Sequence, residues 1–222
     1  ELPLATLADW AQRLLRAAPA RPSAWAAGGL ALADMLTTTT TSTNSANNTN
    51  NSSNKEAVAT ALRMLETALE ANPLLLACWS RLAALYVLGD RSTTAIERCV
   101  TALKHAERKA ASTHSTTYHR STAAVLLAQG RANERLGHAQ AALAAYSAAV
   151  EELRALGEAA GLEQSEAYHR YVDALLATER YQQAHDAAAA ALERSDPARL
   201  GILASKRSFF EGEARRLKGD NA

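Results

Sequence analysis

The chain has 222 residues, with 24 Lys and Arg against 23 Asp and Glu, and a formal net charge of +1. This balance argues against a nucleic-acid-binding protein, in which a basic stripe supplies most of the affinity for phosphate. Aromatic residues make up only 5% of the chain. Together with the β-branched residues they are too few for a sheet, so we predict an all-α fold.

The remaining composition points to an intracellular protein without a membrane span. No apolar run approaches the roughly 18 residues that a transmembrane helix needs, so we expect no membrane insertion. Cys78 and Cys99 are the only cysteines. Two cysteines are too few for a disulfide scaffold and favour a reducing, cytoplasmic location. Cys99 is expected to pack in the core, and Cys78 to be unreactive.

The first predicted element is an amphipathic helix over residues 6–19, with Leu7, Ala11 and Leu14 on one face. The stretch aligns with the second helix of a repeated pair, although its small and large residues are exchanged. A signal peptide is not indicated, because the stretch is interrupted by charged residues and lacks a continuous apolar centre.

A short phrase occurs twice: Pro19 is followed six residues later by Trp25, and Pro73 is followed six residues later by Trp79. The two occurrences of the phrase lie 54 residues apart. When the polar tract at 37–54 is left out, the separation falls to the mid-thirties, which is the length of a helix-turn-helix repeat. This tract consists almost only of Thr, Ser and Asn, and has too little apolar surface to offset its ordering entropy. We therefore predict a disordered, low-complexity insertion at 37–54, in the turn of the first repeat.

The second repeat has the clearest helical periodicity. Gly89 and Asp90 mark a turn, and Gly89 is expected to end the preceding helix in the left-handed conformation. On either side of the turn, small or apolar residues recur at spacings of three and four, which places each set on one helical face. These residues are Trp79, Leu82, Ala83 and Tyr86 before the turn, and Ala95, Cys99 and Ala102 after it.

This arrangement resembles the tetratricopeptide repeat, which has Trp, Leu, a small residue and Tyr on its first helix, and Ala, a bulky residue and Ala on its second. Two positions depart from the pattern, since Cys99 stands in a usually aromatic place and Glu107 in the usual Pro place. The resemblance implies a right-handed superhelix of antiparallel helix pairs that binds other proteins and has no catalytic activity.

Weaker versions of the pattern indicate about four repeats within one solenoid over residues 1–222. Equivalent first-helix positions later in the chain lie 47 and 42 residues apart, which predicts longer second helices and loops, similar to the variant repeats of kinesin light chains and LGN adaptors. Residues 198–218 predict a C-terminal capping helix. The residues that carry the pattern are Trp25, Gly29, Leu32, Ala61, Leu65 and Ala68; Leu126, Gly130, Ala142, Tyr146 and Ala149; and Tyr168, Tyr171, Leu175, Ala184, Ala188 and Ala191.

The sequence has none of the motifs that would indicate chemistry at a site. A phosphate-binding loop, a dinucleotide fingerprint, a nucleophile elbow and a zinc-protease motif are all missing, so we predict that the protein is not an enzyme. His105, His114 and His119 are spaced by nine and five residues, which does not bring them to one helical face. We therefore expect no metal and no cofactor.

The candidate partner-binding residues flank the packing positions of the first helices, which line the concave face of such a solenoid. Their mixture of apolar and charged groups fits an amphipathic helix or an extended segment of a partner protein. The plain alternative for each position is solvated surface. The candidates are Ala77, Ser80, Ala84 and Val87; Leu127, Arg131, Glu134 and Arg135; and Glu166, His169, Asp173 and Leu176.

One established partner class is disfavoured. Tetratricopeptide co-chaperones hold the terminal carboxylate of a chaperone tail with Lys and Asn on first helices. The corresponding positions hold Ala26 and Leu30, then Ser80 and Ala84, which offer no such donors. Two further alternatives to an adaptor stay open: an architectural subunit of a large assembly, and a solenoid domain of a longer, catalytic chain.

Overall fold

The computed structural model describes residues 6, 9, 10, 13, 22–42, 52–110, 116–156, 161–193 and 216. Within these ranges the chain is helical and has no strand, which confirms the predicted all-α class. No helix in the described ranges is both long enough and apolar enough to cross a membrane. The helices are α2 (Pro22–Ser42), α3 (Ser52–Ala71), α4 (Leu76–Leu88), α5 (Ser92–Ala110), α6 (Thr116–Arg135), α7 (Ala139–Arg154), α8 (Gly161–Ala177) and α9 (Tyr181–Glu193).

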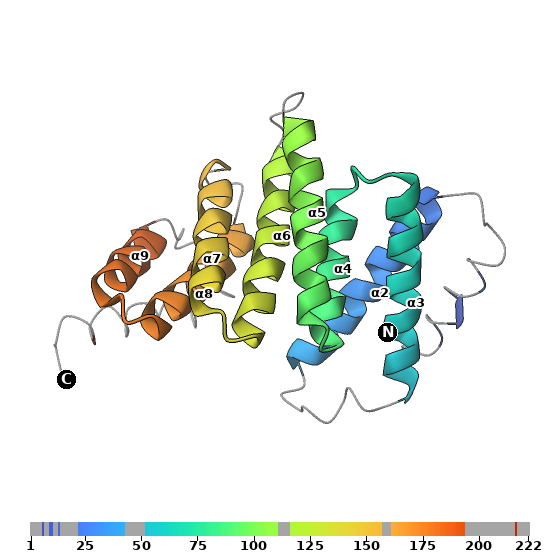
Figure 1. Cartoon of the computed structure of the whole chain (residues 1–222), viewed down its shortest axis with the longest axis horizontal. Helices are drawn as coiled ribbons and strands as arrows, with labels where there is room; N and C mark the ends of the chain where they lie inside the picture. Colours follow the sequence, from blue (N-terminus) through green and yellow to red (C-terminus); the bar gives the residue numbers. More distant parts are fainter. Residues whose placement is uncertain are drawn as a thin grey trace. The chain divides into compact units, whose positions relative to one another are not determined.

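Consecutive helices pack in pairs, α2 on α3, α4 on α5, α6 on α7 and α8 on α9 (Figure 1). These four pairs correspond to the four predicted repeats. The chain divides into two compact units, one with α2–α5 in residues 1–113 and one with α6–α9 in residues 114–222. In the first unit α4 also packs on α2 and α3, and in the second unit α7 packs on α8. The predicted helix at 6–19 and the capping helix at 198–218 lie outside the described residues, apart from single positions.

The predicted packing faces form the core. The second-repeat residues from Trp79 to Ala102 that define the pattern are all buried, and so are most of their counterparts in the other pairs. Thus the 3.6-residue periodicity identified the buried sides of the helices correctly. Trp25 and Tyr171 are half-buried instead.

In two of the helix pairs a glycine of the first helix faces a large side chain of the second. A Cβ atom placed on Gly130 would lie 2.3 Å from Tyr146 Cε1, and one on Gly29 would lie 2.9 Å from Leu65 Cδ2. The backbones approach this closely only because glycine has no side chain there.

The residue sizes at equivalent positions are reciprocal in two of the last three pairs. In these three pairs the two positions are separated by 16 residues, and both are buried in each pair. A small first residue accompanies a large second residue in α6 and α7, and a larger first residue accompanies a small second residue in α8 and α9, as close packing at native density requires, whereas both residues are small in α4 and α5. The three combinations are Ala83 with Cys99, Gly130 with Tyr146, and Val172 with Ala188.

The same hydrogen-bonded turn joins the helices of the last three pairs. The residue at its left-handed position is Asp90, Gly137 or Glu179, with φ of 61°, 74° and 60°. The next N–H in each turn donates to a carbonyl five residues back, as in a Schellman motif. These bonds are Arg91 to Tyr86 at 2.8 Å, His138 to Asn133 at 2.9 Å and Arg180 to Leu175 at 2.9 Å.

Gly89 is the C-cap residue of α4, as predicted, but the expected left-handed conformation is wrong, because its φ is −81°. Asp90, one residue later, takes that conformation. The hydrogen bond from Arg91 to Tyr86 fixes which residue must adopt positive φ, and aspartate tolerates it better than most residues.

This turn gives a conformational prediction with an internal control. Gly137→Ala is expected to lower the free energy of unfolding by about 1 kcal/mol, because an L-residue at φ 74° is strained. A Cβ at Gly137 meets no atom within 4 Å, so crowding does not contribute. Gly89→Ala, at negative φ, is expected to leave stability unchanged or slightly higher. Urea denaturation followed by circular dichroism compares them, and equal effects would contradict the assignment.

The polar tract is partly helical. Helix α2 continues through Ser42 and α3 begins at Ser52, so nine residues of the tract lie in helices. Thr37 Oγ1 donates to the carbonyls of Ala33 and Asp34, both at 3.0 Å, within its own helix. Each residue added to an existing helix gains one hydrogen bond, whereas starting a helix fixes three residues for one hydrogen bond. The predicted disorder is therefore wrong for these nine residues, and 43–51 lie outside the described residues.

Candidate functional site

The candidate positions on α4 and on the middle of α6 lie largely inside the fold. Ser80, Val87 and Leu127 are buried, and Ala84 is half-buried. Ser80 Oγ donates to the carbonyl of Ala77 at 2.9 Å, so its hydroxyl is used within α4. These side chains offer little surface to a partner.

The candidates on the later part of α6 and on α8 meet in one cluster, which we call the α6–α8 charged face: Arg131, Glu134, Glu166, His169, Arg170 and Asp173. Arg131 Nη2 of α6 donates to Glu166 Oε1 of α8. Arg170 Nη1 of α8 lies 4.0 Å from Glu134 Oε2 of α6. The side chains of these two ion pairs are between 35% and 51% exposed. Each of the two helices, α6 and α8, thus contributes one acidic and one basic side chain to these ion pairs.

Further contacts hold this face in shape. Tyr146 of α7 donates its hydroxyl to Glu134 Oε2 at 2.8 Å. Burial, followed by this hydrogen bond and the carboxylate charge, raises the pKa of the Tyr146 hydroxyl far above its ordinary value. The phenol therefore stays protonated and donating at neutral pH. On α8, His169 Nε2 lies 3.6 Å from Asp173 Oδ2.

Both guanidinium groups of the face retain donor capacity. The Nε atoms of Arg131 and Arg170 are inaccessible to solvent and make no hydrogen bond to the described residues. A buried donor without an acceptor costs free energy, so an acceptor that reached these groups would be favoured.

Arg170 was missed by the sequence reasoning, although one signal could have identified it. It follows Glu166 by four residues, and side chains at this spacing lie on the same side of a helix. Arg135, the remaining candidate on α6, is exposed in the last turn of that helix.

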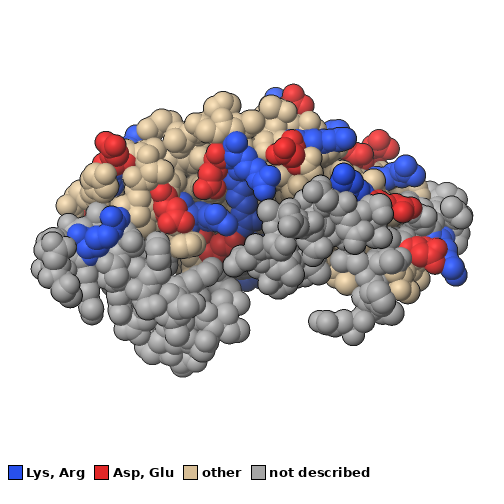
Figure 2. Space-filling model, turned by 90° about the horizontal axis from the view of Figure 1, so that it is seen from below, with Lys and Arg blue, Asp and Glu red and all other residues tan. Residues whose placement is uncertain are grey.

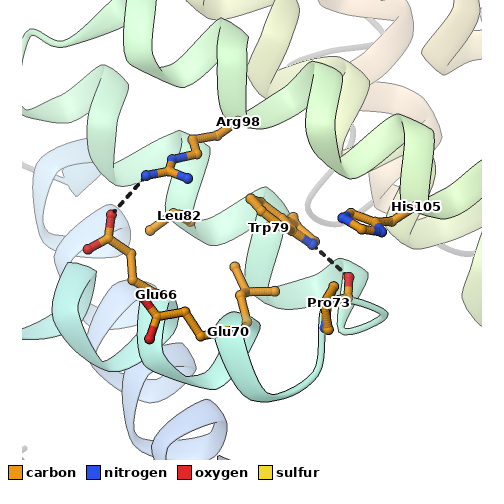
Figure 3. A pocket seen from close by; sticks show the side chains of 8 residues that line it. Glu66, Glu70, Pro73, Trp79, Leu82, Arg98 and His105 are labelled. Carbon is orange, nitrogen blue, oxygen red and sulfur yellow. Dashed lines mark hydrogen bonds and ion pairs between the residues drawn. The ribbon is translucent and has the colours of Figure 1, made fainter.

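A second feature is a cavity of about 300 Å³ in the first unit (Figure 3). Trp79 forms part of its wall, and its Nε1–H donates to the carbonyl of Pro73 at 2.8 Å. The indole is stacked with the imidazole of His105, with ring centroids 6.0 Å apart and planes 19° apart. The described lining consists of Glu66, Leu69 and Glu70 on α3, Pro73, Trp79 and Leu82 on or just before α4, and Arg98 and His105 on α5.

Neither thiol is a nucleophile at neutral pH. Burial raises the pKa of Cys78 to about 11 and that of Cys99 to about 12. The reactive thiolate form is therefore scarce in the folded protein. Among the described residues, no group of three His, Cys, Asp or Glu side chains is placed to hold a metal ion.

Among the described residues on the face drawn in Figure 2, Lys and Arg side chains lie beside Asp and Glu side chains.

No family model matches the chain, and no curated protein sequence does. Among solved structures, the crystal structure of BtubC (BKLC) from P. vanneervenii is similar over 99% of this chain and 92% of that chain, with a TM-score of 0.61 and 18% identity. The crystal structure of the APC/C hetero-tetramer Cut9–Hcn1 is matched over 97% of this chain and 43% of that chain, with a TM-score of 0.31 and 13% identity. The first likeness shows the fold alone. The described part of the chain has the predicted all-α fold of paired helices.

Proposed function

We propose that this chain is a non-catalytic scaffold that binds a segment of a partner protein along the α6–α8 charged face. The observation that carries the proposal is the meeting of half-exposed acids and bases from two successive first helices, through Arg131 with Glu166 and Glu134 with Arg170. A face with both signs in fixed positions favours one orientation of a complementary segment and disfavours others.

The energetics of the ion pairs support exchange with a partner. Partly exposed ion pairs contribute only about 0–1 kcal/mol each, because water screens them and the long side chains lose rotamer freedom. A partner carboxylate or carbonyl can therefore replace an intrachain contact at low cost.

The test is a double variant that exchanges the acid and the base of one ion pair, so that the pair is kept but each helix carries the opposite charge. Arg131→Glu combined with Glu166→Arg conserves net charge and the attraction between α6 and α8, so the fold is expected to be as stable as before. The matched control swaps Glu151 and Arg154, an ion pair at 2.7 Å on α7. Each variant is used as bait in the lysate of the source cells, and captured proteins are quantified by mass spectrometry.

We expect the α6–α8 swap to lower capture of the main partner by about tenfold or more, which corresponds to about 1.4 kcal/mol, and the α7 swap to leave it unchanged. Equal capture by the original chain and by the α6–α8 swap would show that the partner binds elsewhere. Washing at high salt separates a transient adaptor, which loses its partner, from a fixed subunit, which retains it.

A further inference from the structure

The cavity lies in the first unit, whereas the α6–α8 charged face lies in the second. It is bounded by two second helices, α3 and α5, together with Pro73 and the first half of α4. Its volume of about 300 Å³ is at the lower end for ligand pockets and suits one long side chain.

Half of the described lining residues are apolar, and the other half are Glu66, Glu70, Arg98 and His105. Leu69 and Leu82 contribute aliphatic surface, and Trp79 contributes an indole that is fixed by its hydrogen bond to Pro73. Trp79 is only 6% exposed, so packing against its neighbours in the core fixes the orientation of its indole. Leu74, next to Pro73, is an exposed apolar side chain beside this region. A guest with an apolar stem would therefore find a preformed wall.

The charges of the lining are not balanced. Glu66 accepts a hydrogen bond from the Tyr86 hydroxyl and lies 3.6 Å from Arg98 Nη2, so its charge is compensated (Figure 3). Glu70 follows Glu66 by one helical turn and makes no hydrogen bond or ion pair to the described residues. The cavity thus combines four apolar side chains with the exposed carboxylate of Glu70, which has no counter-ion among the described residues.

We propose that this cavity binds an arginine side chain of a partner protein. The aliphatic part of that side chain lies against the apolar part of the lining, and its guanidinium pairs with the exposed carboxylate of Glu70. Arginine fits better than lysine, because its planar group pairs with a carboxylate through two parallel hydrogen bonds and also packs against aromatic rings such as Trp79. The proposal does not depend on the α6–α8 charged face, which lies in the other unit.

The probe is Nα-acetyl-L-arginine methylamide, titrated into the full chain labelled with nitrogen-15. The reporter is the Trp79 indole N–H signal, which is assigned by its loss in Trp79→Phe. We expect a saturable shift with a dissociation constant on the order of 1–10 mM, as befits a single side chain. The neutral isostere, Nα-acetyl-L-citrulline methylamide, is expected to give no saturable shift.

Two variants isolate the carboxylate. Glu70→Gln removes the charge at constant shape and is expected to weaken arginine binding by about fivefold or more. Glu97→Gln makes the same charge change at an exposed position of α5 that does not line the cavity, and is expected to have no effect. Equal binding of arginine and citrulline, unchanged affinity in Glu70→Gln, or no saturation by about 50 mM would each overturn the proposal. None of these results bears on capture through the α6–α8 charged face.

Discussion

Replacing Trp79 with alanine is expected to lower the free energy of unfolding by about 3–5 kcal/mol, the range for truncating a buried aromatic side chain. The indole is 6% exposed, is stacked with His105 and donates its Nε1–H to the carbonyl of Pro73. Removing it leaves a cavity in the α4 face of the core and an unbonded carbonyl at the start of α4. Urea denaturation followed by circular dichroism measures the loss.

Two control variants separate the contributions at this position. Trp79→Phe keeps an aromatic ring and loses the hydrogen bond to Pro73, which is expected to cost about 1 kcal/mol for the bond, plus the loss from the smaller ring. Trp10 is 51% exposed, and Trp10→Ala is expected to change stability by no more than about 0.5 kcal/mol. An unchanged urea midpoint in Trp79→Ala would mean that the repeat register is wrong.

Adding one methyl group at Gly130 is expected to lower the free energy of unfolding by about 2 kcal/mol. The new Cβ would lie 2.3 Å from Tyr146 Cε1, far inside van der Waals contact. Tyr146 cannot withdraw, because it is 1% exposed and its hydroxyl is bonded to Glu134. The clash outweighs the gain of about 1 kcal/mol that alanine normally brings over glycine in a helix.

A double-variant cycle tests that explanation. In the background of Tyr146→Leu, the ring is gone, and Gly130→Ala is expected to be neutral or stabilising. Gly29→Ala provides a milder comparison, since its Cβ would meet Leu65 Cδ2, the end of a flexible side chain, at 2.9 Å. An undiminished cost of Gly130→Ala in the Tyr146→Leu background would rule out the clash with the ring as its cause.

Helix pairing was predictable from the sequence because each packing face repeats at helical spacing over several turns. The turn residue was harder to predict. The first glycine after α4 suggested Gly89, whereas the Schellman hydrogen bonds place Asp90 at positive φ. Glu179 occupies the same position in the last pair, so glycine alone is a poor guide to this conformation here.

The candidate site was predictable only in part. Arg131 and Glu166 were found because they flank the packing positions of the first helices α6 and α8. Ser80 and Val87 occupy the same kind of position on α4, but this helix packs on α2, α3 and α5, so little of its surface is left open. The cavity at Glu70 was not predictable, because its lining comes from three helices whose spacing in the chain gives no common pattern.

The reciprocal residue sizes at the helix crossings limit how such a chain can be rearranged. Val172 would not fit opposite Tyr146, a position where even the Cβ of alanine is too close to the ring. Placing Gly130 opposite Ala188 would leave a void. A single helix therefore cannot be moved from one repeat to another without a second change in its new neighbour. The smallest segment that can be exchanged, duplicated or grafted intact is the whole helix pair.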